Sequence, residues 1–279
     1  MPLSKTLQRL RVQLYHRWGR LTSARRGLPG ALIIGPRRTG TTTMYQTLRL
    51  HSKIFGVSRK EIKYFDCNYH QKLDWYRSFF PYQETIEDSG GLAIEASPYY
   101  IYHPLAAERI AEHFPEIKLI ALLRNPIDRA YSNYHMNFDL DVEHLPTFEE
   151  AIAAEPERLA GEVEKIIADP DHSLFNHMHL SYLNQGIYVD QLERWFSIFP
   201  REQVLVVQSE RFYKEMADVY GEILDFLDLP HEPLKTERNA NPGKYPPMKP
   251  ETRQELVDYF RPHNQRLYTL LGKTYDWDC

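Results

Sequence analysis

Leu32 to Leu48, LIIGPRRTGTTTMYQTL, is the stretch that decides the fold. Its Gly35 and Gly40 have the spacing of the nucleotide-binding pattern G-x-x-x-x-G-K-[ST], in which a strand leads through a loop into a helix. Thr41 stands where that pattern has its lysine. Backbone N–H groups of such a loop, with the positive end of the helix dipole, bind a phosphate or a similar anion. The stretch therefore predicts a strand, an anion-binding loop and a helix.

The loop lacks the parts with which a kinase or NTPase handles magnesium. Such an enzyme places the loop lysine on the β- and γ-phosphates and holds Mg²⁺ with a second-strand aspartate. Here the apolar run 118–123 leads into Arg124 instead. The loop has its own cations and hydroxyls, which are Arg37, Arg38, Thr39, Thr41 and Thr42. We therefore expect anion binding without Mg²⁺, and no His/Asp cluster predicts a metal site. The alternative is a tight strand–helix turn with two arginines in solvent.

Short apolar runs alternate with helical stretches along the chain, and this alternation indicates the fold class. The runs 31–35, 92–95, 118–123 and 203–208 have the character of central strands in a parallel sheet. Helices are expected at residues 41–51, 72–80, 104–113, 126–138, 148–168, 181–198, 212–227 and 250–271. We predict a P-loop-like α/β fold with three layers, α/β/α, around a central parallel sheet.

The first 30 residues differ from the rest in charge. They contain seven Lys or Arg and no acid, whereas the remainder has 27 basic and 38 acidic residues, a net of −11. Leucines and Trp18 recur there at helical spacing. We predict a basic amphipathic helix and linker over 1–30 and a single domain over 31–279. Residues 1–26 either dock on the domain or contact an anionic membrane surface, and the narrow apolar stripe favours docking.

Composition excludes several classes of protein. A formal charge of −4 argues against a nucleic-acid binder. No apolar run is long enough to span a bilayer, and basic residues interrupt the N-terminus before a signal-peptide core could form. Cys67 and Cys279 are the only cysteines, so neither a disulfide framework nor a zinc site is expected. We expect a cytoplasmic protein, with membrane association as the alternative.

Five segments, in order, resemble the sulfotransferases that use 3′-phosphoadenosine 5′-phosphosulfate (PAPS). GPRRTGTT is similar to the 5′-phosphosulfate loop, usually written KTGTT, and KEIKYFD at 60–66 is similar to a KEPHFFD-like segment. EASPYY at 95–100 and LLRNPIDRAYSNY at 122–134 resemble the Ser/Thr-Pro-x-Tyr stretch and the 3′-phosphate signature. FRPHNQRLYTLLGKTYDW at 260–277 resembles the terminal helix and tail. The resemblance is greatest to the heparan sulfate and bacterial carbohydrate branch.

The resemblance implies a site for each end of PAPS. The loop residues Arg37, Arg38, Thr39, Gly40, Thr41 and Thr42 would hold the phosphosulfate. Arg124 and Ser132 would hold the 3′-phosphate, because arginine binds phosphate through two parallel hydrogen bonds and a hydroxyl adds another. Gly243 and Lys244 fall where relatives have a Lys-Gly loop that closes over PAPS, here in reversed order.

The same resemblance assigns catalytic roles. Glu61 matches the glutamate that serves as general base, and His135 is the alternative base because histidine titrates closest to neutral pH. Arg38 replaces the family lysine and would stabilise charge on the departing phosphate, although arginine does not serve as a proton donor. Lys63, where relatives have histidine, would line the acceptor cleft, together with two further residues, His70 and Trp75.

We therefore predict a sulfotransferase that moves the sulfuryl group of PAPS to a hydroxyl or amine of a carbohydrate, glycolipid or other small molecule, without a metal. The alternatives are a P-loop kinase with a displaced basic residue and a non-catalytic module that binds PAPS or its product PAP. The missing loop lysine counts against the first, and Glu61 together with a loop cation counts against the second.

Overall fold

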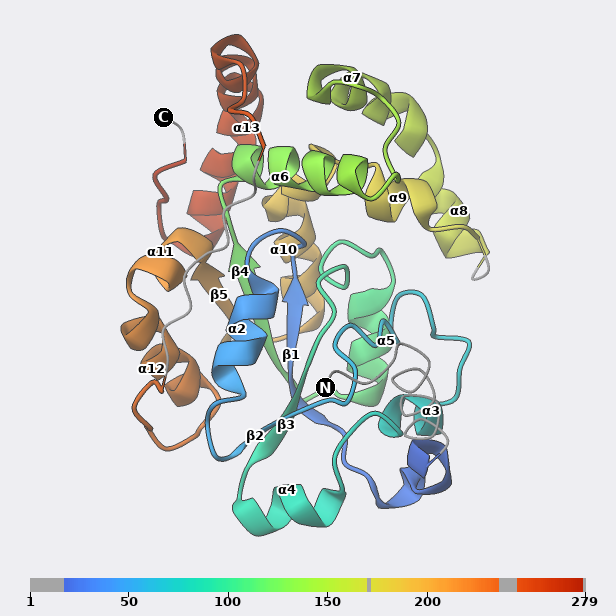
Figure 1. Ribbon diagram of the computed structural model, residues 1–279, viewed down its shortest axis with the longest axis vertical. Helices are drawn as coiled ribbons and strands as arrows, with labels where there is room; N and C mark the ends of the chain where they lie inside the picture. The colour runs from blue at the N-terminus through green and yellow to red at the C-terminus, as the bar shows by residue number, and fades with distance from the viewer. Residues whose placement is uncertain (1–17, 170–171, 236–244, 278–279) are drawn as a thin grey trace, which may run out of the picture.

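Five parallel strands form the centre of the molecule, in the spatial order β2-β3-β1-β4-β5 (Figure 1). Their bounds are β1 Pro29–Gly35, β2 Ile54–Gly56, β3 Leu92–Ala96, β4 Lys118–Leu123 and β5 Val204–Gln208. This computed structural model describes residues 18–169, 172–235 and 245–277. The central strands are apolar almost throughout because both faces of the sheet are covered. In β1, Ala31 to Ile34 are at most 1% exposed.

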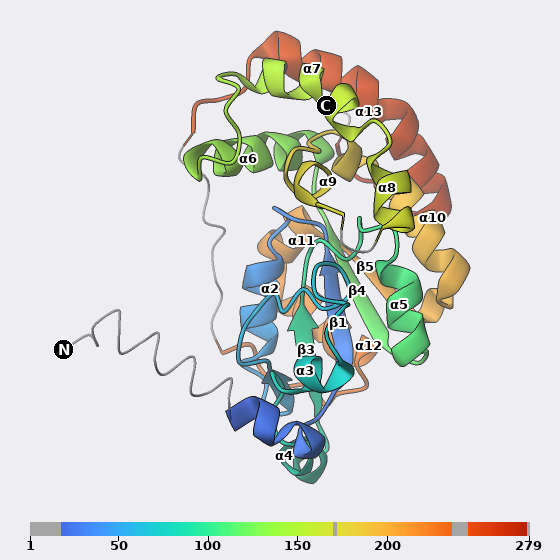
Figure 2. The same cartoon turned by 90° about the vertical axis from the view of Figure 1, so that its right-hand side faces the viewer.

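Helices cover both faces of this sheet. α2 (Thr41–Leu48) lies on one face, while α5 (Ala106–His113) and α10 (Tyr188–Ile198) lie on the other (Figure 2). The α/β/α architecture and the all-parallel sheet are thus confirmed. The other helices are α3 Leu73–Arg77, α4 Gln83–Ser89, α6 Pro126–Asp139, α7 Phe148–Leu159, α8 Glu162–Ala168, α9 Phe175–His179, α11 Ser209–Lys214, α12 Met216–Phe226 and α13 Pro250–Leu271, with 3-10 turns at Ser23–Arg25, Asn184–Gly186 and Arg201–Gln203.

The carboxyl ends of the strands meet at one edge, and two helices lie across it. The register pairs Ile33 of β1 with Ala96 of β3 and with Ile120 of β4, so these strands end close together. α6 and α9 lie above that edge (Figures 1 and 2). In parallel α/β sheets this edge is where ligands bind.

Several element predictions were wrong in detail. The helix expected over 148–168 is two helices, because Gly161 takes a left-handed conformation with φ of 69° between α7 and α8. The stretch 212–227 is divided between α11 and α12, and 181–198 begins with a 3-10 turn before α10. β2, α4 and α9 were not predicted; they span three, seven and five residues, too few to show a clear period.

The described part of the N-terminal segment docks on the body of the protein. Residues 18–21 are helical, and Trp18 Nε1 donates a hydrogen bond of 3.1 Å to the Tyr82 hydroxyl. Arg26 Nη1 donates to the Phe80 carbonyl at 2.6 Å. Most of the predicted amphipathic helix, residues 1–17, lies outside the described residues, and the domain boundary at residue 30 stays a prediction. Among the helices of the described ranges, none has the length and apolar character required to cross a membrane.

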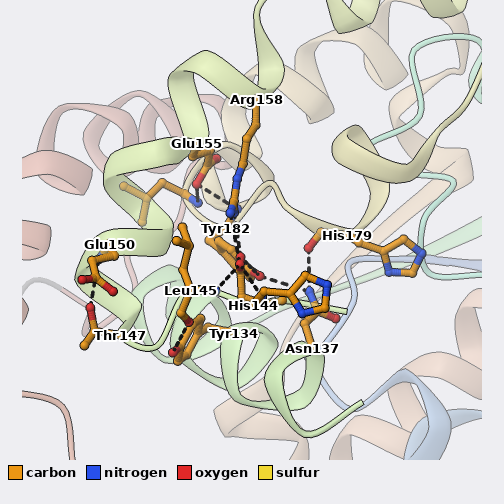
Figure 3. A network of polar contacts seen from close by, with 12 residues as sticks. Tyr134, Asn137, His144, Leu145, Thr147, Glu150, Glu155, Arg158, His179 and Tyr182 are labelled. Carbon is orange, nitrogen blue, oxygen red and sulfur yellow. Dashed lines mark hydrogen bonds and ion pairs between the residues drawn. The ribbon is translucent and has the colours of Figure 1, made fainter. Parts of the chain in front are cut away.

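A network of polar contacts joins α7 to the helices above the sheet (Figure 3). Glu155 of α7 accepts three backbone N–H groups, from residues 182–184, at 2.7–2.8 Å. Glu143 accepts from Arg158 at 2.6 and 3.0 Å and from the Tyr182 hydroxyl at 2.9 Å. Asn137 of α6 donates to the His179 carbonyl at 2.6 Å. These contacts hold α9 in place beside the sheet edge.

Replacement of Glu155 by alanine is expected to destabilise the protein strongly. The side chain is 4% exposed, so three backbone donors would lose their partner in a buried setting, at a cost of about 3 kcal/mol or more. Thermal unfolding should show a melting temperature lowered by about 5–10 °C. Glu157→Ala, on the exposed side of the same helix, is the matched control. Equal melting temperatures for both variants would contradict the structural role of Glu155.

Candidate active site

The loop after β1 turns sharply at three positions. Gly35, Arg38 and Gly40 have φ values of 125°, 67° and 99°, in the left-handed region that favours glycine. A Cβ on Gly40 would lie 2.6 Å from the Tyr213 hydroxyl, so the position also lacks room for a side chain. The Ser209 hydroxyl, directly after β5, donates to the Thr39 carbonyl at 2.6 Å. The loop is therefore held from two sides in a shape that leads into α2.

The two loop arginines contact different helices. Arg38 reaches α6, where its Nε and Nη2 donate to the Ser132 hydroxyl at 3.0 and 2.9 Å. Its Nη1 contacts the Met136 sulfur at 3.2 Å. Arg37 instead reaches α9, where Nη1 donates to the Met178 carbonyl at 2.7 Å and lies 3.4 Å from His179 Nδ1. The sequence grouped these neighbours together, whereas in the structure Arg38 contacts α6 and Arg37 contacts α9.

Arg124 and Ser132 both contact Arg38, so the two anion sites implied by the family resemblance adjoin. Arg124 follows β4, and its Nη1 donates to the Arg38 carbonyl at 3.2 Å. Its own carbonyl accepts from the Tyr188 hydroxyl at 2.8 Å. Asn125 caps α6 by accepting from the Ile127 N–H at 3.0 Å, and this cap orients the helix that carries Ser132.

Several arginines lie at this edge, and within the described residues none of them forms an ion pair with a carboxylate. Burial lowers the pKa of the Arg37 and Arg38 guanidinium groups, and neighbouring arginines lower it further, although the charge of Glu61 opposes the shift at Arg37. Arg129 of α6 is fully buried and donates to the Tyr182 carbonyl, while its Nε and Nη1 have no partner. Within the described ranges, no carboxylate forms an ion pair with Arg37, Arg38, Arg124 or Arg129. Such a set of donors fits a ligand with several negative charges.

Glu61 and Lys63 lie in a strained turn beside the loop. Both have left-handed backbones, with φ of 58° and 55°, which is uncommon for residues with side chains. Glu61 donates its N–H to the Ala96 carbonyl at 3.2 Å, and its carboxylate pairs with the Lys60 ammonium at 2.8 Å. The Glu61 side chain remains 37% exposed. This half-exposed carboxylate is close enough for its charge to act on Arg37.

Glu95, at the end of β3, supports this turn from below. Its carboxylate accepts from the Ser97 hydroxyl at 2.6 Å, and the Ser97 oxygen in turn accepts the Lys63 N–H at 3.0 Å. Burial raises the pKa of Glu95 to about 8. The ionisable groups that face it are Tyr45, Lys60, Asp66, Tyr76 and Tyr100. The buried acid thus connects β3, through Ser97, to Lys63 in the turn.

The remaining predicted site residues make other contacts. His135 stacks on Tyr245 with ring centroids 4.5 Å apart, and its buried Nε2 has no partner. Burial lowers the pKa of His135. His70 is exposed beside Gln71, and Trp75 packs edge-on against Phe79 at 4.8 Å. No hydrogen bond or ion pair among the described residues joins these three to the loop, and their roles stay predictions.

Two predicted residues lie outside the described structure, and four residues that contact the loop were not predicted from the sequence. Gly243 and Lys244 lie outside the described residues. Ser209, Tyr213, Met178 and His179 were missed as contacts of the loop because they come from segments far away in the chain, with no local motif. The family resemblance of EASPYY, which contains Ser97, was the one feature of the sequence that pointed to the hydrogen bonds beneath the Glu61 turn.

The comparisons with known proteins identify the family. The family model described as "Sulfotransferase domain" matches residues 28–277, so the chain belongs to the sulfotransferase family. The crystal structure of a sulfotransferase from Alicyclobacillus acidocaldarius has the same fold, with a TM-score of 0.67 and 24% identity over 90% of this chain and 99% of that chain. The predictions of family, fold and a transferase of the sulfotransferase class are confirmed.

Curated relatives share the domain and extend beyond it. The chain is 27% identical to membrane-associated sulfotransferase kil1 of Dictyostelium discoideum, over 90% of this chain and 66% of that protein. It is 32% identical to human bifunctional heparan sulfate N-deacetylase/N-sulfotransferase 3, over 88% of this chain and 30% of that protein. Mouse heparan sulfate glucosamine 3-O-sulfotransferase 3A1 is 29% identical, over 90% and 65%. The chain thus spans about two thirds of the lengths of kil1 and of the 3-O-sulfotransferase. It spans under a third of the bifunctional enzyme.

Glu95 should make the stability of the protein depend on pH. Because folding raises its pKa from 4.5 to about 8, the folded state binds more protons than the unfolded state between these values. Stability is therefore lost as pH rises through this window, by at most about 1.4 kcal/mol per pH unit. Urea unfolding of the wild type and Glu95→Gln at pH 5, 6, 7 and 8 should show the variant gaining relative stability with pH. Exposed Glu84→Gln is the control, and a constant difference between wild type and Glu95→Gln would refute the shift.

Proposed function

We propose that the chain is a PAPS-dependent sulfotransferase that acts on a hydroxyl or amine of a carbohydrate, glycolipid or other small-molecule acceptor. The observation that carries this proposal is the contact of Arg38 with both partners of the second anion site, Ser132 and Arg124. One ligand with an anionic group at each end would span these two sites. Membership in the sulfotransferase family supports the same donor.

The residues present fit this donor. The backbone N–H groups of the loop and the hydroxyls of Thr41 and Thr42 would hold its 5′ end, beside Arg38. Arg124 and Ser132 would hold the 3′-phosphate. The Ser132 oxygen accepts from Arg38 in both of its contacts, so its own O–H can still donate to a phosphate. When bound, PAPS supplies an electrophilic sulfur attached to a good phosphate leaving group.

The chain's residues have two tasks in the transfer. Glu61 takes the proton from the acceptor O–H or N–H, whose freed electron pair forms the new bond to sulfur. PAPS would supply the sulfuryl group and a phosphate leaving group, whose oxygen would depart with the electron pair of the broken S–O bond. Arg38 stabilises the resulting negative charge electrostatically, and its guanidinium keeps its proton. His135 is the second candidate base, on the α6 side of the loop.

The names of the relatives support the proposed class of acceptor. Two of them carry heparan sulfate modification in their names, as N-sulfotransferase and as glucosamine 3-O-sulfotransferase, which supports a carbohydrate acceptor here. Both nitrogen and oxygen acceptors occur among these names. The name of kil1 describes that protein as membrane-associated. We therefore keep two alternatives for this chain, a cytoplasmic location and contact of residues 1–26 with a membrane.

Nucleotide binding should discriminate the donor from ADP and ATP. PAP should bind at least about 100-fold more tightly than ADP, with or without Mg²⁺, because two charge-assisted contacts to the 3′-phosphate are worth about 1.5–3 kcal/mol each. Calorimetry with PAP, ADP and ATP measures this ratio. Ser132→Ala should weaken PAP and leave ADP nearly unchanged, with exposed Ser197→Ala as control. Tight Mg²⁺-dependent ATP binding would instead favour the P-loop kinase.

Removal of the proposed base should separate chemistry from donor binding. Glu61→Gln should lower kcat by about 10²–10⁴-fold while PAP affinity stays within about twofold of the wild type. His135→Gln should keep most of the rate. Product formation from ³⁵S-labelled PAPS in a single turnover gives the chemical step. A full rate for Glu61→Gln with a large loss for His135→Gln would transfer the role to histidine, and PAP binding with no transfer by the wild type would favour the non-catalytic module.

A further inference from the structure

A cavity of about 110 Å³ lies among α8, α9, α10 and the segment that leads into α5, and we call it the α8–α10 cavity. One buried water needs about 10–15 Å³, so this cavity has room for a small organic molecule. None of its lining residues is among those predicted above for the donor, the acceptor or catalysis. The lining residues that decide its chemistry are Tyr102, Val163, His177, Ile187, Asp190 and Arg194.

His177 supplies a neutral hydrogen-bond donor. Its ring stacks on Tyr102 with centroids 4.1 Å apart, and its Nδ1 lies 2.7 Å from the Tyr99 hydroxyl. Burial raises the pKa of Tyr99, so this hydroxyl keeps its proton and is assigned as the donor to Nδ1, which places the ring proton on Nε2. Burial lowers the pKa of His177 to about 3. Nε2 has no hydrogen-bond partner among the described residues, so its N–H is available to a ligand in the cavity.

Arg194 of α10 supplies a cation. Its Nη2 donates to the carbonyls of residues 101–103 at 2.9–3.4 Å. Within the described ranges, its Nη1 donates no hydrogen bond and no carboxylate forms an ion pair with the side chain. Burial lowers the pKa of the guanidinium, although the charge of Glu108 opposes the shift. A partly buried cation whose partners are carbonyls gains from a bound anion.

The rest of the lining favours an organic anion over an inorganic one. Ile187, Val163 and the Tyr102 ring are apolar surfaces on which a hydrocarbon group can pack. Asp190 is the acidic residue of the lining, and its carboxylate already pairs with Arg266 Nη1 at 2.8 Å. A bare sulfate or phosphate would leave the apolar surfaces without a partner.

We propose that the α8–α10 cavity binds a small organic carboxylate. Its oxygens accept hydrogen bonds from Arg194 and His177, and its short hydrocarbon part packs on Ile187 and Val163. This site is distinct from the proposed donor and acceptor sites, and the inference does not rest on the proposed function. His177 precedes Met178, whose carbonyl accepts from Arg37, so the bound acid contacts the same short helix as the loop after β1.

Butyrate, butyramide, acetate and inorganic sulfate test the proposal as matched probes, by saturation-transfer NMR for the organic ones and calorimetry for sulfate. Butyrate should bind saturably and at least about tenfold more tightly than butyramide, which has the same shape without the charge. It should bind at least about fivefold more tightly than acetate, which lacks two methylene groups. Saturating PAP should leave butyrate binding unchanged. Absence of saturable binding, displacement by PAP, or equal affinity for butyrate and any other probe would overturn the proposal.

Two substitutions in α8 locate the bound probe. Val163 is 39% exposed and lines the cavity, so Val163→Trp should fill part of it and weaken butyrate at least tenfold. Ile167→Trp is the matched control, because Ile167 is 54% exposed and lies outside the lining. This variant should bind butyrate as the wild type does. Equal affinities of the two variants for butyrate would contradict the proposed location.

Replacement of the cation separates recognition of charge from a structural role. Arg194→Gln should weaken butyrate at least tenfold and leave butyramide within about twofold, because only the charged probe loses a charge-assisted contact. Thermal unfolding of this variant checks that it folds, and the tryptophan pair decides the question if it does not. Unchanged butyrate affinity in folded Arg194→Gln would overturn the assignment of the carboxylate to Arg194.

Discussion

The guanidinium of Arg38 donates two hydrogen bonds to Ser132, and this contact joins the loop after β1 to the helix after β4. Everything proposed for the donor depends on it, because it places a phosphosulfate loop and a 3′-phosphate site side by side. The parallel sheet makes the contact possible by ending β1 and β4 at the same edge. The Asn125 cap then starts α6 so that Ser132, two turns along, faces back toward the loop.

The charge at this edge is costly for the protein without a ligand. Arg37, Arg38 and Arg129 are partly or fully buried, and their partners among the described residues are carbonyls, a hydroxyl, a sulfur and the His179 ring nitrogen, with no carboxylates. Burial of unpaired cations opposes folding, so the surrounding packing must offset it. In return, the hydrogen-bond donors are already in position for a polyanion. No ion pair of these arginines has to break before the polyanion binds.

Local patterns predicted the parts of the site that are continuous in the chain. The strand–loop–helix at 31–48, the Arg124 strand end and the helix with Ser132 each have a hydrophobic period or a glycine pattern. The different contacts of Arg37 and Arg38 had no such signal, since the contacts of Arg37 depend on α9, a helix of five residues. The support of the Glu61 turn by Ser97 and Glu95 likewise arises only when β2, which precedes the turn, pairs with β3. Gly161 broke a helix that its periodicity alone made continuous.

The most direct test of the account is a crystal structure of the protein with PAP. The 5′-phosphate should lie on the N–H groups of the loop 38–42, with the 3′-phosphate within hydrogen-bond distance of both Arg124 and Ser132. A nucleotide whose 3′-phosphate lies away from these two side chains would contradict the claim that one ligand spans two adjoining anion sites.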